Sequence, residues 1–201
     1  MATARKPETT DGRALRSERS RATIASALYE LVGEGNLEPT AQQVAERADV
    51  GIRTVFRHFS DMEALYATLD ARLLAEVMPM LRDGPPSDTS LRERAAALVS
   101  DRAALFERIA PYKRSSNLKR WRSPYLTAQH RKLVGELRAR LLRWLPELRD
   151  ASDEVVEALD QAASFEAWDR LRSDQRLGRP RARAAMERSV RALLNELEEE
   201  R

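Results

Sequence analysis

The sequence has 201 residues and is 42% hydrophobic and 33% charged, but only 5% aromatic. Ala, Leu, Arg and Glu, all good helix formers, dominate, so a large sheet is excluded. The 35 basic and 32 acidic residues leave a net charge of +3, which is too small to indicate a nucleic-acid partner by itself.

The sequence contains no cysteine and two histidines. Disulfides, thiolate nucleophiles and cysteine-ligated zinc are therefore excluded, and we expect no metal and no cofactor. There is no apolar stretch of signal-peptide type and no apolar run of about 18 residues that would span a membrane. We therefore expect a cytoplasmic protein with no membrane partner.

The chain begins with a polar segment, residues 1–12, which we expect to be a disordered arm. Four arginines follow in the next nine residues: Arg13, Arg16, Arg19 and Arg21. A helix is predicted from near Ser17 to the Gly33–Gly35 stop, with a buried stripe of Ile24, Leu28, Leu31 and Val32.

Two short helices are predicted next. Thr40 and Gln43 form a capping box that opens the first, and Asp49–Gly51 makes a tight turn before the second, which runs to about His58. This spacing is typical of a helix-turn-helix. The free backbone N–H groups at the start of the helix that Thr40 opens can hold a phosphate.

A helical wheel of residues 51–59 separates two faces. Val55 and Phe59 define the inward direction, so Arg53, Thr54 and Arg57 point outward, with Ile52 and Phe56 on the flanks. An outward Arg can fork onto guanine, and Thr can bond a phosphate or meet a thymine methyl. A solvated helix face is the alternative interpretation of this pattern.

The residues from Thr40 to Leu65, TAQQVAERADVGIRTVFRHFSDMEAL, resemble the DNA-binding domain of tetracycline-repressor-type (TetR family) regulators, and the resemblance is close over residues 17–70. It implies phosphate contacts for Thr40, Thr54 and His58. It also implies base reading or backbone contact near Ile52, Arg53 and Arg57. Phe56 and Met62 stand where the family has Tyr and Lys, which removes two expected phosphate contacts. The predicted DNA-binding residues are Thr40, Gly51, Ile52, Arg53, Thr54, Phe56, Arg57 and His58.

A long helix over residues 61–81 is expected to join two domains, a helix-turn-helix domain at 13–66 and an effector-binding and dimerisation domain at 67–201. Prolines and glycines then divide the chain into helices near 89–110, 112–121, 124–145, 152–175 and 180–199. The fold class is thus all-α, with about nine helices.

The last two helices carry apolar stripes, which either pack on the body of one chain or pair two chains. TetR-like proteins dimerise through such a terminal pair, and a two-fold dimer matches a palindromic DNA site. The predicted dimer-interface residues are Val155, Leu159, Ala163, Met186, Val190, Leu193, Leu194 and Leu197.

Aromatic residues of the middle helices either form core or line a pocket for a small-molecule effector. The candidate ligand-binding residues are Phe106, Asn117, Trp121, Tyr125, Phe165 and Trp168.

The sequence carries no phosphate loop, GxSxG elbow or HExxH motif, so we assign no catalytic residue and expect no enzyme. The predicted function is a transcriptional regulator, a ligand-responsive repressor that binds a palindromic DNA operator as a homodimer. The alternative is a helical protein-interaction module that has lost DNA binding.

Overall fold

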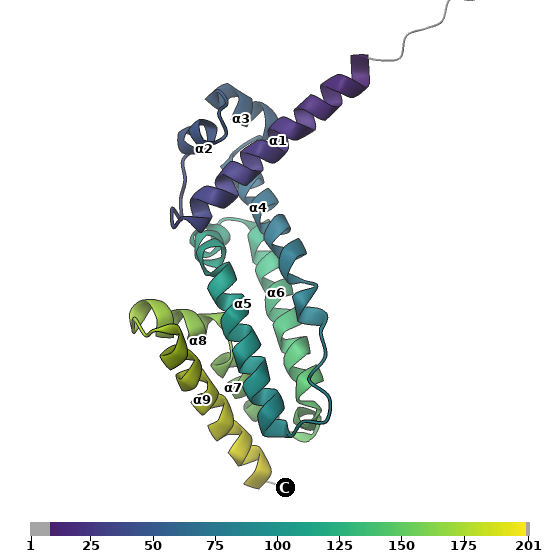
Figure 1. The fold of residues 1–201 in the computed structure, drawn as a ribbon, viewed down its shortest axis with the longest axis vertical. Helices are drawn as coiled ribbons and strands as arrows, with labels where there is room; N and C mark the ends of the chain where they lie inside the picture. Colours follow the sequence, from purple (N-terminus) through teal and green to yellow (C-terminus); the bar gives the residue numbers. More distant parts are fainter. Residues whose placement is uncertain (1–8, 200–201) are drawn as a thin grey trace, which may run out of the picture. The chain divides into compact units, whose positions relative to one another are not determined.

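The computed structural model describes residues 9–199, with side chains described for residue 12 and residues 14–196. All the regular structure in these residues is helical, which confirms the all-α fold class (Figure 1). Within this part of the chain, no helix has the length and apolar character that a membrane crossing requires. Contacts divide the chain into two compact units, one up to Leu73 with Pro111–Thr127, the other Leu74–Ala110 with Ala128 onward.

The first unit contains the N-terminal helices α1 (Thr9–Gly33), α2 (Ala41–Arg47) and α3 (Ile52–His58). Helix α1 begins earlier than the sequence predicts, so residues 9–12 are helical rather than part of an arm, while residues 1–8 lie outside the described residues. The core of this unit is built from apolar side chains at the helical spacing expected: Ile24, Leu28, Val32, Val44, Ala45, Val55, Phe59, Leu65 and Leu69.

Helix α1 ends in a Schellman motif. The N–H of Asn36 bonds to the carbonyl of Leu31, and the N–H of Gly35 bonds to that of Val32. Gly35 has a φ of +99°, which residues with a side chain rarely adopt. Gly33, in contrast, is the last helical residue, and its missing side chain leaves room for the hydroxyl of Tyr112.

Three longer helices cross the division between the units. They are α4 (Met62–Val77), α5 (Leu91–Arg120) and α6 (Pro124–Trp144). The prediction that Pro111 separates two helices was wrong, because α5 continues through it. Apolar side chains on both sides of the proline, Phe106, Ile109 and Tyr112, are buried, so packing outweighs the backbone hydrogen bond that proline removes.

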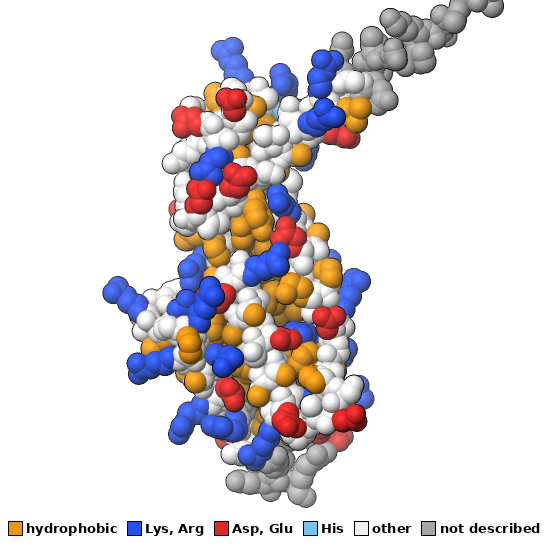
Figure 2. Space-filling model, in the orientation of Figure 1, with side chains coloured by type: hydrophobic (Ala, Val, Ile, Leu, Met, Phe, Trp, Pro, Cys, Tyr) orange, Lys and Arg blue, Asp and Glu red, His pale blue; other side chains and the backbone are white. Residues whose placement is uncertain are grey.

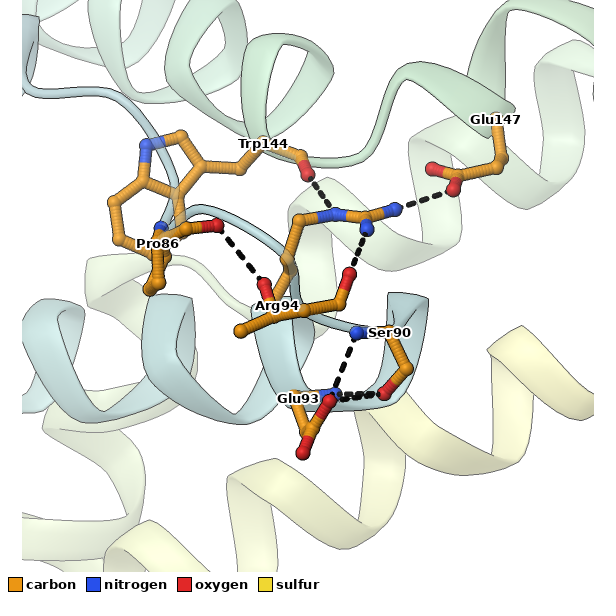
Figure 3. Close-up of polar contacts among 7 residues, drawn as sticks. Pro86, Ser90, Glu93, Arg94, Trp144 and Glu147 are labelled. Carbon is orange, nitrogen blue, oxygen red and sulfur yellow. Dashed lines mark hydrogen bonds and ion pairs between the residues drawn. The ribbon is translucent and has the colours of Figure 1, made fainter.

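The second unit contains a polar cluster around Arg94, at the start of α5 (Figure 3). The Arg94 guanidinium donates to the carbonyls of Trp144 and Thr89, at 2.9 and 2.6 Å, and pairs with Glu147. Ser90 and Glu93 form the capping box that opens the helix. These contacts tie the segment before α5 to the end of α6.

The remaining helices of this unit are α7 (Asp153–Ala162), α8 (Phe165–Asp169) and α9 (Arg179–Glu199), with a π-helical turn at Arg170–Asp174. Figure 1 shows α9 running alongside α7 and α8. The single helix predicted over 152–175 is therefore broken, because Ser164 caps α8 by accepting from the N–H of Ala167. The buried Arg102 side chain donates to the carbonyl of Ala163 at 2.7 Å and supports the break.

Candidate nucleic-acid interface

The turn between α2 and α3 is built from local hydrogen bonds. Thr40 and Gln43 form the predicted capping box at the start of α2. At its end, the N–H of Val50 bonds to the carbonyl of Ala45 and that of Asp49 to Glu46, again a Schellman motif. Asp49 takes the left-handed conformation, with a φ of +52°, which Asp tolerates better than most residues. The turn thus depends on Asp49, whereas Gly51 has an ordinary extended backbone.

Helix α3 has the two faces that the wheel predicts. Val55 and the following Phe59 are buried, while Arg53 and Arg57 are exposed. Thr54 is half-buried. Two apolar side chains are exposed beside the arginines, Ile52 at 39% and Phe56 at 48%. Exposed apolar side chains of this size next to cations indicate a surface that meets another molecule.

Arg53 and Arg57 carry uncommitted donors. Neither side chain hydrogen-bonds or forms an ion pair with another residue in the part of the chain that the structure describes. Each guanidinium has five N–H donors, in a geometry that matches phosphate oxygens and the guanine edge. The face of α3 can therefore donate to an anionic or acceptor-rich partner without first breaking a contact of its own.

His58 is held at the end of α3, half-buried. Its Nε2 is buried with no hydrogen-bond partner among the described residues. Burial lowers the pKa of the imidazole, and the nearby charges of Arg57 and Arg21 lower it further, so the ring is neutral near pH 7. A phosphate contact by His58 would then come from a neutral ring.

Arg21, one of the four arginines in the first half of α1, is not a free cation. Its guanidinium donates to the carbonyl of His58 at 2.8 Å and lies 4.4 Å from the centre of the Phe59 ring. Arg21 therefore fastens the end of α3 to α1. Arg16 and Arg19 are exposed, and the side chain of Arg13 lies outside the described residues.

The last part of α5 supports the helix-turn-helix from within the same unit, which the sequence did not predict. The ring of Tyr112 stacks on that of Tyr29, with centroids 4.3 Å apart. Ser115 donates to the carbonyl of Leu37 at 2.6 Å, and Lys119 pairs with Glu38 at 2.9 Å. The only sequence signal was Gly33, whose small size admits Tyr112.

The six candidate ligand-binding residues are divided between the two units. Asn117, Trp121 and Tyr125 belong to the first unit, while Phe106, Phe165 and Trp168 belong to the second. The rings of Phe106 and Phe165 meet edge to face, 5.7 Å apart, and both are buried, as is Trp168. For these three the structure favours the alternative, a core role. Trp121, at the surface, lines a groove.

The predicted dimer-interface residues are mostly turned into their own chain. Val155, Leu159, Ala163, Met186, Val190 and Leu194 are buried and Leu193 is half-buried, while the Leu197 side chain lies outside the described residues. In the single chain these six side chains pack the terminal helices within the second unit, which favours the alternative. Their contact with a partner chain stays a prediction.

Comparison with known proteins identifies the helix-turn-helix segment. Residues 24–69 match the family model of bacterial regulatory proteins of the tetR family, which confirms the resemblance over this segment. No curated protein sequence matches the chain.

Solved structures share the fold over most of the chain. A transcriptional regulator from Rhodococcus sp. Rha1 is 22% identical, with a TM-score of 0.68, over 88% of this chain and 97% of that one. A tetR-family transcriptional regulator from Streptomyces coelicolor is 17% identical, with a TM-score of 0.67, over 90% of this chain and 82% of that one. At these identities the likeness shows the fold alone, an N-terminal helix-turn-helix followed by a helical body.

Proposed function

We propose that this chain, whose residues 24–69 match the family model of bacterial regulatory proteins of the tetR family, is a sequence-specific DNA-binding transcriptional regulator. One observation carries the proposal. Helix α3 buries Val55 and the adjoining Phe59 and leaves Arg53 and Arg57 exposed with every donor uncommitted. The guanidinium of Arg21, in contrast, is held by the carbonyl of His58.

In the proposed complex α3 lies in the major groove, which is about 12 Å wide and admits one helix. Arg53 and Arg57 donate to phosphates or to a guanine edge, and Thr54 donates to a phosphate. Ile52 and Phe56 contact thymine methyl groups, for which their exposed apolar surface is suited. In this complex Thr40, Gly51 and His58, which lie at the ends of α2 and α3, face the sugar-phosphate backbone of the DNA.

The proposal includes a homodimer on a palindromic operator, because one helix-turn-helix domain reads only a few base pairs. Since the apolar stripes are buried in their own chain, the outer faces of the terminal helices are left to meet a partner. Those faces have opposite charges. On α7 Asp153 and Glu154 are exposed, as is Glu157, which pairs with Arg138. Among the described side chains of α9 the exposed arginines outnumber the one exposed glutamate, Glu196. Figure 2 shows Lys and Arg side chains gathered over α8 and α9.

Charge complementarity of this kind fits a two-fold contact in which α7 of one chain meets α9 of the other. Analytical sedimentation at increasing salt concentration tests this contact, and we expect the dimer to dissociate more readily as the salt concentration rises. A monomer at every salt concentration and at concentrations well above those used for DNA binding would remove the dimer from the proposal.

The remaining parts of the proposal are that the regulator is a repressor, acts in the cytoplasm, and responds to a small molecule. The tetR-family match favours a regulator over an enzyme. Repression is tested by a reporter gene placed behind the selected DNA site, whose expression should fall when the protein is present.

The central experiment is DNA binding by Arg57→Ala and Arg53→Ala proteins, on a site selected from a random pool. Each change should cost about 1–3 kcal/mol and, where a phosphate contact is lost, reduce the slope of log affinity against log salt by about 1. Arg149→Ala is the matched control, since Arg149 is exposed in the second unit. Equal affinities for all three variants would refute the assignment of α3, and the absence of any salt-dependent DNA binding would favour the interaction module.

A further inference from the structure

The first unit contains an open groove of about 610 Å³, a volume typical of small-molecule sites. Its walls come from the start of α4, the last turn of α5, the turn into α6 and the loop before α2. We call it the Trp121 groove. It is lined by Glu38, Met62, Glu63, Tyr66, Leu118, Lys119, Trp121, Arg122, Ser123 and Leu126.

The apolar lining of the Trp121 groove is unusually exposed. Trp121 is 82% exposed and Leu118 is 54% exposed, whereas the other two tryptophans, Trp144 and Trp168, are buried. An indole in water beside a hollow offers a flat apolar surface to an aromatic ring. The guanidinium of Arg120 lies 5.0 Å from the centre of the Trp121 ring, yet the indole that lines the groove stays largely exposed. This exposure beside a hollow points to a ligand.

The cations of the groove are free or weakly held. The Arg122 side chain has no hydrogen bond or ion pair with any other described residue. Lys119 pairs with Glu38 at 2.9 Å, but the Glu38 side chain is largely exposed, and ion pairs in such positions contribute little stability. A carboxylate entering the groove can therefore take Arg122 without competition and replace Glu38 on Lys119.

We propose that the Trp121 groove binds an organic anion with an aromatic ring. The ring lies against Trp121 and Leu118, and the carboxylate accepts hydrogen bonds from Arg122 and Lys119. Glu63, exposed on the rim, is the one unpaired carboxylate of the lining and opposes the anion. Because the Glu63 carboxylate repels an anion and attracts a cation, removing its charge tests the sign of the ligand charge.

The position of the groove indicates how a bound anion would act on DNA binding, a consequence that rests on the proposed function. Glu38 lies two residues before Thr40, the cap of α2, and Met62 opens α4 directly after α3. An anion that replaces Glu38 on Lys119 loosens the loop that leads into α2. The binding itself needs no DNA and is tested without it.

The test uses three probes that share one ring and differ in charge: 1-naphthoate, naphthalene-1-carboxamide and 1-naphthylmethylammonium. Binding to the full-length protein is measured by calorimetry and by quenching of tryptophan fluorescence, to which the exposed Trp121 should respond most. Naphthoate should bind about tenfold more tightly than the amide, as expected for hydrogen bonds to charged groups. Preference for the ammonium, or equal binding of all three, would overturn the proposal.

Variants locate the site and check the sign. Arg122→Ala should weaken naphthoate binding about tenfold, Trp121→Ala should abolish the quenching and weaken the heat signal, and Glu63→Gln should tighten binding. Arg149→Ala is again the control and should change nothing. If Arg122→Ala and Trp121→Ala both bind naphthoate as the parent does, the groove is not the site. A protein that binds naphthoate but no DNA would refute the proposed function and leave the groove intact.

Discussion

Two glycines offer the same substitution with opposite expected effects. Gly35, at the end of α1, has a φ of +99°, where any side chain is strained. Gly51, the cap of α3, has a φ of −70° and a ψ of 145°, and a Cβ there would meet no atom within 4 Å. Serine at position 35 must therefore distort the Schellman motif, whereas serine at 51 enters an unstrained backbone in open space.

The magnitudes follow from these geometries. Gly35→Ser should lower the free energy of unfolding by about 1–2 kcal/mol, the cost of placing a side chain in the left-handed region. Gly51→Ser should raise it by about 0.5–1 kcal/mol, because the unfolded chain loses freedom and the hydroxyl can cap α3. For a chain of this length, 1 kcal/mol corresponds to about 2–4 °C in Tm.

The assay is urea and thermal unfolding followed by circular dichroism, with Gly84→Ser as a control at an exposed loop position. The two variants should shift Tm in opposite directions. If Gly35→Ser unfolds at the same urea concentration as the parent, or if Gly51→Ser is destabilised as much as Gly35→Ser, the backbone argument for this head is wrong.

Three further predictions concern buried polar groups. Arg102→Ala should lower the free energy of unfolding by about 3 kcal/mol in urea titrations, because the carbonyls of Ala163 and Leu137 lose their donor and a cavity remains. A loss below about 1 kcal/mol would contradict this prediction. Burial raises the pKa of Asp70, so the carboxyl favours folding while it is protonated, and this contribution is lost as pH rises above ~4. The stability of Asp70→Asn relative to the parent should therefore increase from acid to neutral pH. Parallel profiles of unfolding free energy against pH for the two proteins would refute this prediction. Arg94→Ala should cost about 2 kcal/mol in the same titrations, since two carbonyls and a carboxylate lose their donor, and an unchanged urea midpoint would show that the cluster is dispensable.

The helix-turn-helix was predictable from sequence because its signals are local. The capping box at Thr40 and the inward pair of Val55 and Phe59 depend on residues within a few positions of one another, and the structure has both. The turn lies where it was predicted, and Asp49 is the residue in it that takes the left-handed conformation. A glycine in a sequence indicates a turn without showing which residue takes the unusual φ.

What failed depends on contacts between distant residues. Helix α5 continues through Pro111 because its neighbours are buried on both sides, and no local pattern reports that burial. The break between α7 and α8 is capped locally by Ser164, but it is also supported by the Arg102 side chain, about sixty positions earlier. An apolar stripe likewise indicates burial without identifying the surface against which it is buried, so the sequence left both a partner and the same chain open for the residues of α7 and α9.

The support that α5 gives to the head shows the same limit. Ser115 and Lys119 hold the loop before α2 from nearly eighty residues away, and a sequence alone pairs neither with Leu37 or Glu38. The exposure of Trp121 was also beyond prediction, since a tryptophan in a helical segment is usually core.

The central claim is that α3 presents Arg53 and Arg57 to duplex DNA. Selection of bound DNA from a random pool, followed by the salt dependence of binding to the selected site, tests it most directly. We expect an enriched site with two-fold symmetry and an affinity that falls steeply with salt, more steeply for the parent than for Arg57→Ala. A pool that shows no enrichment, with salt-independent retention that is identical in the parent and the variant, would contradict it.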